Sequence, residues 1–151
     1  MLDWKFKHFN DLNLYEFHDI LALRIKVFVV EQNCPYQELD GNDKKSFHLL
    51  CTKEEGNIVG TLRILPPGVQ YKEVAIGRIV LDPSIRGKNH GHQMMDEALT
   101  FINEEYGNTP VKISGQKHLE AFYESHEFKS TGKEYLEDGI PHVEMIYNPK
   151  N

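Results

Sequence analysis

The chain has 151 residues, 40% of them hydrophobic and 26% charged, and a formal net charge of −6 at pH 7. We expect one globular domain over residues 1–151, because this length and composition suit a single hydrophobic core. The acidic balance opposes generic nucleic-acid binding, and no apolar run is long enough to cross a membrane.

The start of the chain lacks the layout of a signal peptide, so we expect a cytoplasmic protein. Its two cysteines, Cys34 and Cys51, would then stay reduced. An acidic protein is also compatible with a cationic substrate such as an amine, although acidity alone serves solubility equally well.

The first part of the chain predicts a strand, a helix and a loop. Residues 4–9 alternate apolar and polar, as in a half-buried strand. Apolar residues three and four positions apart then predict a helix that Asn10, Asp11 or Asn13 could cap: Leu14, Phe17, Leu21, Ile25 and Phe28. This helix should fray through residues 29–31 and stop before Pro35. The polar residues 32–45 form a loop long enough to be functional.

The rest of the chain predicts a mixed sheet. Strands at residues 47–52, 58–65 and 73–81 have short links and should be antiparallel. A helix runs from about Asn89 to Gly107, so the strand at 110–115 should lie parallel to the one at 73–81. A last helix carries Leu119, Phe122, Tyr123 and His126 on one face, and strands at 128–136 and 143–147 follow.

The junction at residues 79–92 is the most informative segment. An apolar strand ends at Asp82-Pro83, and a turn with glycines and basic residues opens the next helix. Such a turn presents unpaired N–H groups and the positive end of the helix dipole, and Arg86 and Lys88 add charge. We interpret it as a pyrophosphate site, although a junction of this kind often serves packing alone. It matches neither the P-loop nor the G-x-G-x-x-G dinucleotide fingerprint.

The turn resembles the R-x-x-G-x-G motif by which the GNAT superfamily of acetyl-CoA-dependent N-acetyltransferases binds its cofactor. Arg86 stands at the Arg position and Gly91 at the second Gly. Asn89 replaces the first Gly, and Asn tolerates a left-handed backbone best after Gly. The predicted order β-α-β-β-β-α-β-α-β-β also resembles the GNAT fold along nearly the whole chain.

Four separated strings look like the ElaA-like branch of that superfamily. They are Leu-Arg-Ile-Lys-Val-Phe-Val-Val-Glu-Gln at 23–32, Cys-Pro-Tyr with Asp-Gly at 34–41, Gln-Lys-His-Leu-Glu-Ala-Phe-Tyr at 116–123, and Glu-Asp-Gly-Ile-Pro-His at 137–142. The resemblance implies an α/β fold with a mixed, mostly antiparallel twisted sheet of about seven strands and helices on both faces.

The resemblance also implies the reaction and its cofactor. Acetyl-CoA would donate its acetyl group to an amine by direct attack, with no acyl-enzyme. The pantetheine arm would lie between the strands at 73–81 and 110–115 and pair with backbone of Ile79, Val80 and Leu81. The pyrophosphate would lie on the turn made by Arg86, Gly87, Lys88, Asn89, His90, Gly91 and His92.

An acid and a base would assist this reaction. Tyr123 matches the tyrosine that many GNAT enzymes place near the CoA sulfur, so the resemblance makes it the general acid; a core tyrosine is the competing interpretation. Glu31 and Glu73 are the candidate bases. Neither is distinguished from the other by the sequence.

Five residues are candidates for substrate binding: Arg24, Glu38, Asp40, His48 and His142. For each of them, a role in structure or solvation alone is the alternative interpretation. Loop carboxylates are usually solvated, and His48 alternates with apolar neighbours and could face solvent. Arg24 and Arg63 lie in apolar patterns and should pair with carboxylates. The eight histidines show no metal-binding spacing, so we expect no metal.

Two other functions stay open at this point. An acyl-homoserine-lactone synthase shares the fold and resembles the segment at 24–28, but it uses S-adenosylmethionine and needs no pyrophosphate turn. A non-catalytic CoA-binding module is the other. The acceptor would be a small-molecule or peptide amine of unknown identity, and the last strands could pair in a homodimer.

Overall fold

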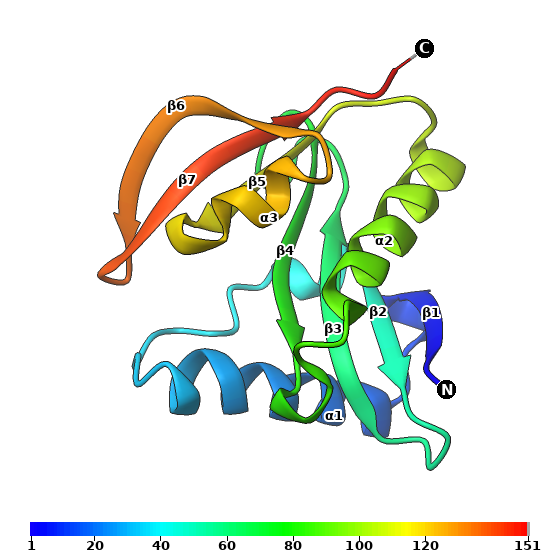
Figure 1. Cartoon of the computed structure of the whole chain (residues 1–151). Coiled ribbons are helices and arrows are strands. Elements are labelled where there is room, and N and C mark those ends of the chain that lie inside the picture. Colours follow the sequence, from blue (N-terminus) through cyan, green and yellow to red (C-terminus); the bar gives the residue numbers. More distant parts are fainter. Residues whose placement is uncertain (151) are drawn as a thin grey trace.

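A computed structural model describes residues 1–150 of the chain, with its elements in the predicted order (Figure 1). The strands are β1 (Asp3–His8), β2 (Phe47–Thr52), β3 (Ile58–Leu65), β4 (Val74–Leu81), β5 (Val111–Gln116), β6 (Phe128–Glu137) and β7 (Ile140–Tyr147). The helices are α1 (Leu14–Arg24), α2 (His90–Tyr106) and α3 (Glu120–Glu124). Short 3-10 turns cover Phe9–Asp11, Asn42–Lys45, Pro83–Ile85 and Lys117–Leu119.

The seven strands form one sheet in the order β1-β2-β3-β4-β5-β7-β6. Every neighbouring pair is antiparallel except β4 and β5, which are parallel as predicted. These two strands pair only at Val74–Val111 and Ala75–Lys112. Beyond that point they part, because β4 continues along β3 while β5 continues along β7. The sheet is therefore open in its middle.

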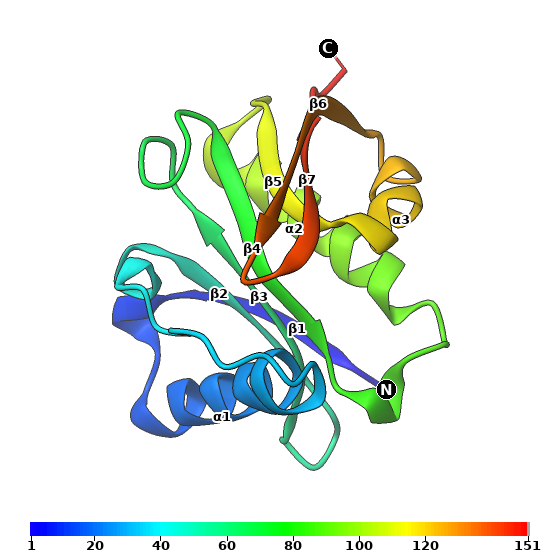
Figure 2. The same cartoon turned by 90° about the vertical axis from the view of Figure 1, so that its left-hand side faces the viewer.

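Helices cover both faces of the sheet, as expected (Figure 2). On one face the apolar side of α2, including Met94 and Met95, packs on Leu62 and Ile64 of β3. On the other face Leu23 and Val27, at the end of α1 and just beyond it, pack on Val80 of β4. Neighbouring residues of a strand point to opposite faces, so β3 and β4 contribute to both layers.

The first helix begins at one of the three predicted caps. The Asn13 side chain accepts from the Glu16 N–H at 2.8 Å, and the Glu16 side chain accepts from the Asn13 N–H at 3.0 Å. This reciprocal capping box satisfies two N–H groups of the first turn. The predicted fraying at residues 29–31 is wrong, because Ile25–Glu31 continues α1 as a π-helix.

Other boundaries differ modestly from those predicted. The last strand begins at Ile140 rather than 143, since a tight turn at Asp138 and Gly139, both with positive φ, lets the ladder start at once. Cys34 and Cys51 are free thiols, as expected. Among residues 1–150 no helix combines the length and apolarity needed to span a membrane.

Candidate active site

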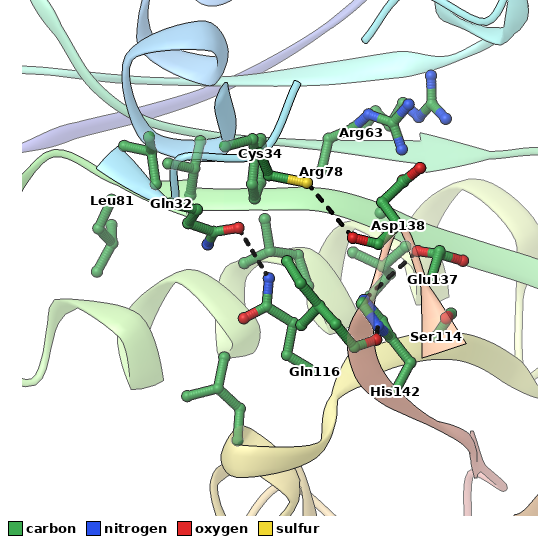
Figure 3. Close-up of a pocket in the computed structure, with 18 of the residues that line it drawn as sticks. Gln32, Cys34, Arg63, Arg78, Leu81, Ser114, Gln116, Glu137, Asp138 and His142 are labelled. Carbon is green, nitrogen blue, oxygen red and sulfur yellow. Dashed lines mark hydrogen bonds and ion pairs between the residues drawn. The ribbon is translucent and has the colours of Figure 1, made fainter. Parts of the chain in front are cut away.

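A cavity of about 750 Å³ opens where β4 and β5 part (Figure 3). Residues 76–81 of β4 form one wall, and Ser114 and Gln116 of β5 lie on the other together with His142 of β7. The loop after α1 and the β6–β7 turn meet above the cavity, where the Cys34 thiol donates to the Asp138 carbonyl oxygen at 3.6 Å. Residues far apart in sequence therefore share one chamber.

The predicted cofactor strand and turn adjoin this cavity. Ile79, Val80, Leu81, Arg86 and Gly91 line it. The other predicted residues complete the turn and the first turn of α2: Gly87, Lys88, Asn89, His90 and His92.

The backbone of the turn has the predicted conformation. Asn89 lies at φ +64° in the left-handed region and Gly87 at φ +79°. Asn therefore does here what Gly does in the motif, and the N-terminus of α2 opens beside the cavity.

The Arg86 side chain is already paired with a carboxylate. Its guanidinium donates to both Glu31 oxygens, at 2.6 and 3.0 Å, and its Nε donates to the Leu81 carbonyl oxygen at 3.1 Å. The hydrogen bond from Arg86 lowers the pKa of Glu31. Glu31 is thus a weaker base than an ordinary carboxylate, and it fixes the exit of the turn to the end of the π-helix.

A β-bulge interrupts β4 along the cavity wall. Thr61 pairs with Val80 but Arg63 pairs with Gly77, so β4 has an extra residue here. Arg78 takes φ +52°, a conformation that is rare for a residue with a side chain. Such a bulge breaks the ladder and turns backbone groups away from the neighbouring strand.

Tyr123 lies deep in the cavity wall and is 5% exposed. Burial raises the pKa of its hydroxyl to about 12, so the group keeps its proton at neutral pH. Its ring packs against Gly115, where an added Cβ would lie only 2.8 Å from a ring carbon. A glycine at this position of β5 is what leaves room for the ring.

At one side of the cavity, an ionic network that includes the lining residues Asp40 and Arg63 ties the loop after α1 to the sheet. Arg24 donates to Glu38 at 2.7 Å and to Asp43 at 2.9 and 3.2 Å. Arg63 donates to Asp43 at 3.0 Å and to Asp40 at 2.6 and 2.9 Å. The predicted pairing of both arginines with carboxylates is confirmed.

This network changes the interpretation of three predicted substrate residues. Arg24 and Glu38 are buried within the network, and neither lines the cavity. The alternative interpretation of Glu38 as a solvated loop carboxylate is therefore wrong. His48 is fully buried rather than facing solvent, because α1 covers its face of the sheet and its Nε2 donates to the Asp43 carbonyl oxygen at 2.9 Å. Asp40 and His142 do line the cavity.

The second candidate base lies elsewhere. Glu73 precedes β4 at the end where β4 and β5 are still paired, and its nearest cation is Lys112 at 3.5 Å. It is not among the residues that line the cavity.

Two polar residues of the site escaped the sequence analysis. Arg78 donates to Glu38 at 2.9 Å and lies over the Tyr36 ring. The sequence signal that could have identified Arg78 was a charged residue inside the otherwise apolar strand β4. Glu137 faces His142 with 3.4 Å between its carboxylate and Nε2. Only the hairpin's register brings those two side chains together. Among residues 1–150 no group of three metal-binding side chains is arranged to hold an ion.

This geometry agrees with the proteins to which the chain is similar. The family described as "Acetyltransferase (GNAT) domain" matches residues 17–148. The crystal structure of an acyl-CoA N-acyltransferase from Pseudomonas aeruginosa is 43% identical and superposes with a TM-score of 0.92, covering 97% of this chain and 99% of that one. The crystal structure of Escherichia coli ElaA is 36% identical with a TM-score of 0.91, covering 98% and 100% of the two chains. The chain belongs to the GNAT family, in its ElaA-like branch.

The relationship extends to eukaryotes. A UPF0039 protein of Schizosaccharomyces pombe is 41% identical over 145 residues, 95% of each chain. As an ElaA-like GNAT protein, the chain is a GNAT-type acyltransferase, and its cleft between β4 and β5 is the candidate active site. This settles the class of enzyme.

Proposed function

We propose that the protein is an acetyl-CoA-dependent N-acetyltransferase that modifies a primary amine by direct attack. One observation carries the proposal: the open β4–β5 cleft ends at a left-handed turn that leads into α2. A long cleft that ends at a set of unpaired N–H groups suits an extended donor with an anionic end.

The residues present fit such a donor. Backbone of Ile79, Val80 and Leu81 would pair with the amide groups of the pantetheine arm, since β5 pairs with β4 only at Val74 and Ala75 and leaves this part of the β4 edge open. The amides from Arg86 to His92 would hold the pyrophosphate, with Arg86 oriented by Glu31. Bound acetyl-CoA would supply the acetyl group as a reactive thioester.

Tyr123 keeps the proton that a general acid must donate, although its raised pKa makes it a weaker acid than an ordinary tyrosine. It is protonated at neutral pH, buried in the cavity wall, and positioned by Gly115 and Phe128. A leaving thiolate, whose thiol has a pKa of about 8–9, could take the hydroxyl proton. The hydroxyl would be reprotonated from solvent.

Calorimetric titration tests the donor site. We expect saturable binding of acetyl-CoA and of CoA by the wild-type protein, and none of S-adenosylmethionine. Gly91→Leu should abolish binding, because its side chain would press on Phe122 and Leu81. Gly91→Ala is the matched control, since a Cβ there meets those side chains at ordinary distances of 3.5–3.7 Å. Binding of S-adenosylmethionine in place of acetyl-CoA would favour a synthase instead.

A further inference from the structure

We propose that His142 is the general base that deprotonates the acceptor amine. The inference rests on the proposed acetyl transfer and adds the residue that makes the amine nucleophilic. An alkyl amine with a pKa near 10.4 is almost wholly protonated at neutral pH, so its lone pair must be freed before attack.

His142 lines the cavity between β4 and β5. It is a β7 residue that pairs in register with Gln116 of β5 and with Tyr135 of β6. Figure 3 shows His142 beside Gln116, whose amide donates across the cavity to Gln32 at 3.4 Å. His142 and residues 76–81 of β4 therefore line the same cavity, in which the thioester would lie.

The hydrogen bonds of the imidazole fix its tautomer. The Nδ1 atom lies 2.7 Å from the Ile140 carbonyl oxygen, and a carbonyl oxygen can only accept. This contact is shorter than the 3.4 Å between Nε2 and the Glu137 carboxylate, so we assign the proton of the neutral ring to Nδ1 and the lone pair to Nε2. A histidine held in this way is poised to take a proton at Nε2.

Glu137 is placed to stabilise the protonated ring. Its carboxylate lies 3.4 Å from Nε2. When the ring is neutral with its proton on Nδ1, the carboxylate oxygen and Nε2 are both hydrogen-bond acceptors, and no proton lies between them. Protonation at Nε2 turns this contact into an ion pair. The Glu137 side chain is 50% exposed, whereas that of His142 is 8% exposed, so Glu137 also connects the buried ring to solvent.

The ring is held in this orientation by its neighbours. Tyr135 stacks on it at a centroid distance of 6.2 Å and an interplanar angle of 18°. The Tyr135 hydroxyl in turn donates to the Ser114 hydroxyl of β5. A base that a stacking partner and a hydrogen bond hold in one orientation loses little entropy at the moment of proton transfer.

The other carboxylates near the cavity are less suited to the role. Glu31 is committed to Arg86, which lowers its pKa. Hydrogen bonds from Arg63 likewise hold the pKa of Asp40 well below its ordinary value. Glu73 is not part of the cavity wall. His118 does line the cavity, but from the exposed 3-10 turn before α3.

Two protons leave the amine and one proton reaches the thiolate in each turnover. Nε2 takes one proton from the ammonium form of the acceptor and passes it to solvent by way of Glu137. The freed nitrogen lone pair forms the bond to the acyl carbon while the carbon–sulfur bond breaks. The second amine proton leaves by the same route, and the thiolate takes the Tyr123 proton, which solvent replaces. One proton is released in each turnover.

The kinetic test compares His142→Gln with His18→Gln, because His18 is an exposed residue of α1 that does not line the cavity. We expect His18→Gln to leave kcat/KM unchanged. Release of CoA thiol from acetyl-CoA would be followed with two acceptors, the ε-amine of Nα-acetyl-lysine amide and a peptide with a free α-amine. We expect His142→Gln to lower kcat/KM for the amine by about 10²–10³-fold at pH 7, with unchanged affinity for acetyl-CoA. The loss should be larger for the ε-amine, because the α-amine, with a pKa of about 7.7–8.0, needs less help.

A second readout needs no acceptor. In a ¹⁵N spectrum of the imidazole, neutral His142 should carry its proton on Nδ1. Glu137→Gln should keep that proton on Nδ1, because the Ile140 carbonyl oxygen still accepts from it. A neutral ring protonated on Nε2 would overturn the assignment.

The outcomes separate the two proposals. A protein that binds acetyl-CoA and loses no rate in His142→Gln, or loses rate only in Glu137→Gln, has another base. A protein that binds acetyl-CoA but acetylates neither probe also contradicts the assignment and leaves the donor site standing. Failure to bind acetyl-CoA would overturn the proposed function itself.

Discussion

At the scale of single residues, the site depends on how closely Tyr123 and Gly115 approach. The ring occupies the space where any other residue at position 115 would place its Cβ, 2.8 Å from one ring carbon and 3.0 Å from the next. The backbone angle of Gly115 is not in the left-handed region, so its requirement is one of space alone.

We therefore predict that Gly115→Ala destabilises the fold by about 1–3 kcal/mol through overpacking. It should also lower kcat, because the hydroxyl of Tyr123 moves. Urea unfolding and thiol-release kinetics measure the two effects. Adding the same alanine to a Tyr123→Leu background should cost less, since the opposing ring is gone; equal costs in both backgrounds would refute the clash.

At the scale of elements, two segments that carry no regular strand or long helix position the site. The turn between β4 and α2 depends on Asn89 at φ +64°. The loop after the π-helix depends on buried ion pairs. Arg63 pairs with Asp40, and both Arg24 and Arg63 pair with Asp43. Glu38 pairs with both Arg24 and Arg78.

For the turn, we predict that Asn89→Gly keeps the stability and acetyl-CoA affinity of the wild type. Asn89→Val should lose about 1–2 kcal/mol, because a β-branched residue is strained in the left-handed region, and should bind acetyl-CoA more weakly. Thermal unfolding and calorimetry measure both. Equal affinities for the two variants would show that the turn's conformation does not matter for binding.

For the loop, Arg24→Met should destabilise the protein by about 3–5 kcal/mol, since it leaves two buried carboxylates without one of their cations. Lys26→Met is the matched control: Lys26 follows closely in the chain and pairs with Asp82 at 2.7 Å, but its side chain is 58% exposed. We expect a change of about 1 kcal/mol or less there. Similar losses in the two variants would contradict the structural role of the network.

At the scale of the whole molecule, the same network makes stability depend on pH. Hydrogen bonds from Arg63 lower the pKa of Asp40 from its ordinary value of 3.8. Burial alone would raise the pKa of Asp43, but Arg24 and Arg63 hold it below 3.8 as well.

The folded state therefore binds fewer protons than the unfolded state at mildly acidic pH. The unfolding free energy should be at its full value above about pH 5 and should fall as the pH drops through 3.8 and below. Asp40→Asn should flatten this dependence when urea unfolding is compared at several pH values. An unchanged slope would mean that Asp40 contributes nothing to the acid sensitivity.

The sequence predicted most of this fold because its signals are local. Strands β2 and β3 and the long helix α2 follow from hydrophobic periodicity and from Gly and Pro at their ends, and the left-handed Asn89 follows from the motif. The π-helix was missed because its residues carry an ordinary helical pattern. His48 was misjudged because burial on its face depends on α1, which is distant in sequence.

The contacts within the site were harder to predict from the sequence, because they depend on how the elements pack and not on local patterns. Glu137 and His142 meet only through the register of a hairpin, and Glu31 meets Arg86 only after β4 and the π-helix have packed. Neither contact has a signature in the spacing of residues. Family resemblance predicted the cleft, and our proposal of His142 as the base rests on hydrogen bonds that the spacing of residues does not predict.

The most direct test of the account is acetyl transfer itself. The purified chain would be incubated with acetyl-CoA and a panel containing a polyamine, an aminoglycoside, an amino acid, a lysine peptide and a free peptide N-terminus. Thiol release and product mass would be followed, with Tyr123→Phe beside the wild type. The account predicts amine-dependent thiol release with an acetylated product, slowed by about 10²-fold or more in the variant. A folded protein that binds acetyl-CoA and acetylates none of these amines would contradict it and favour a CoA-binding module.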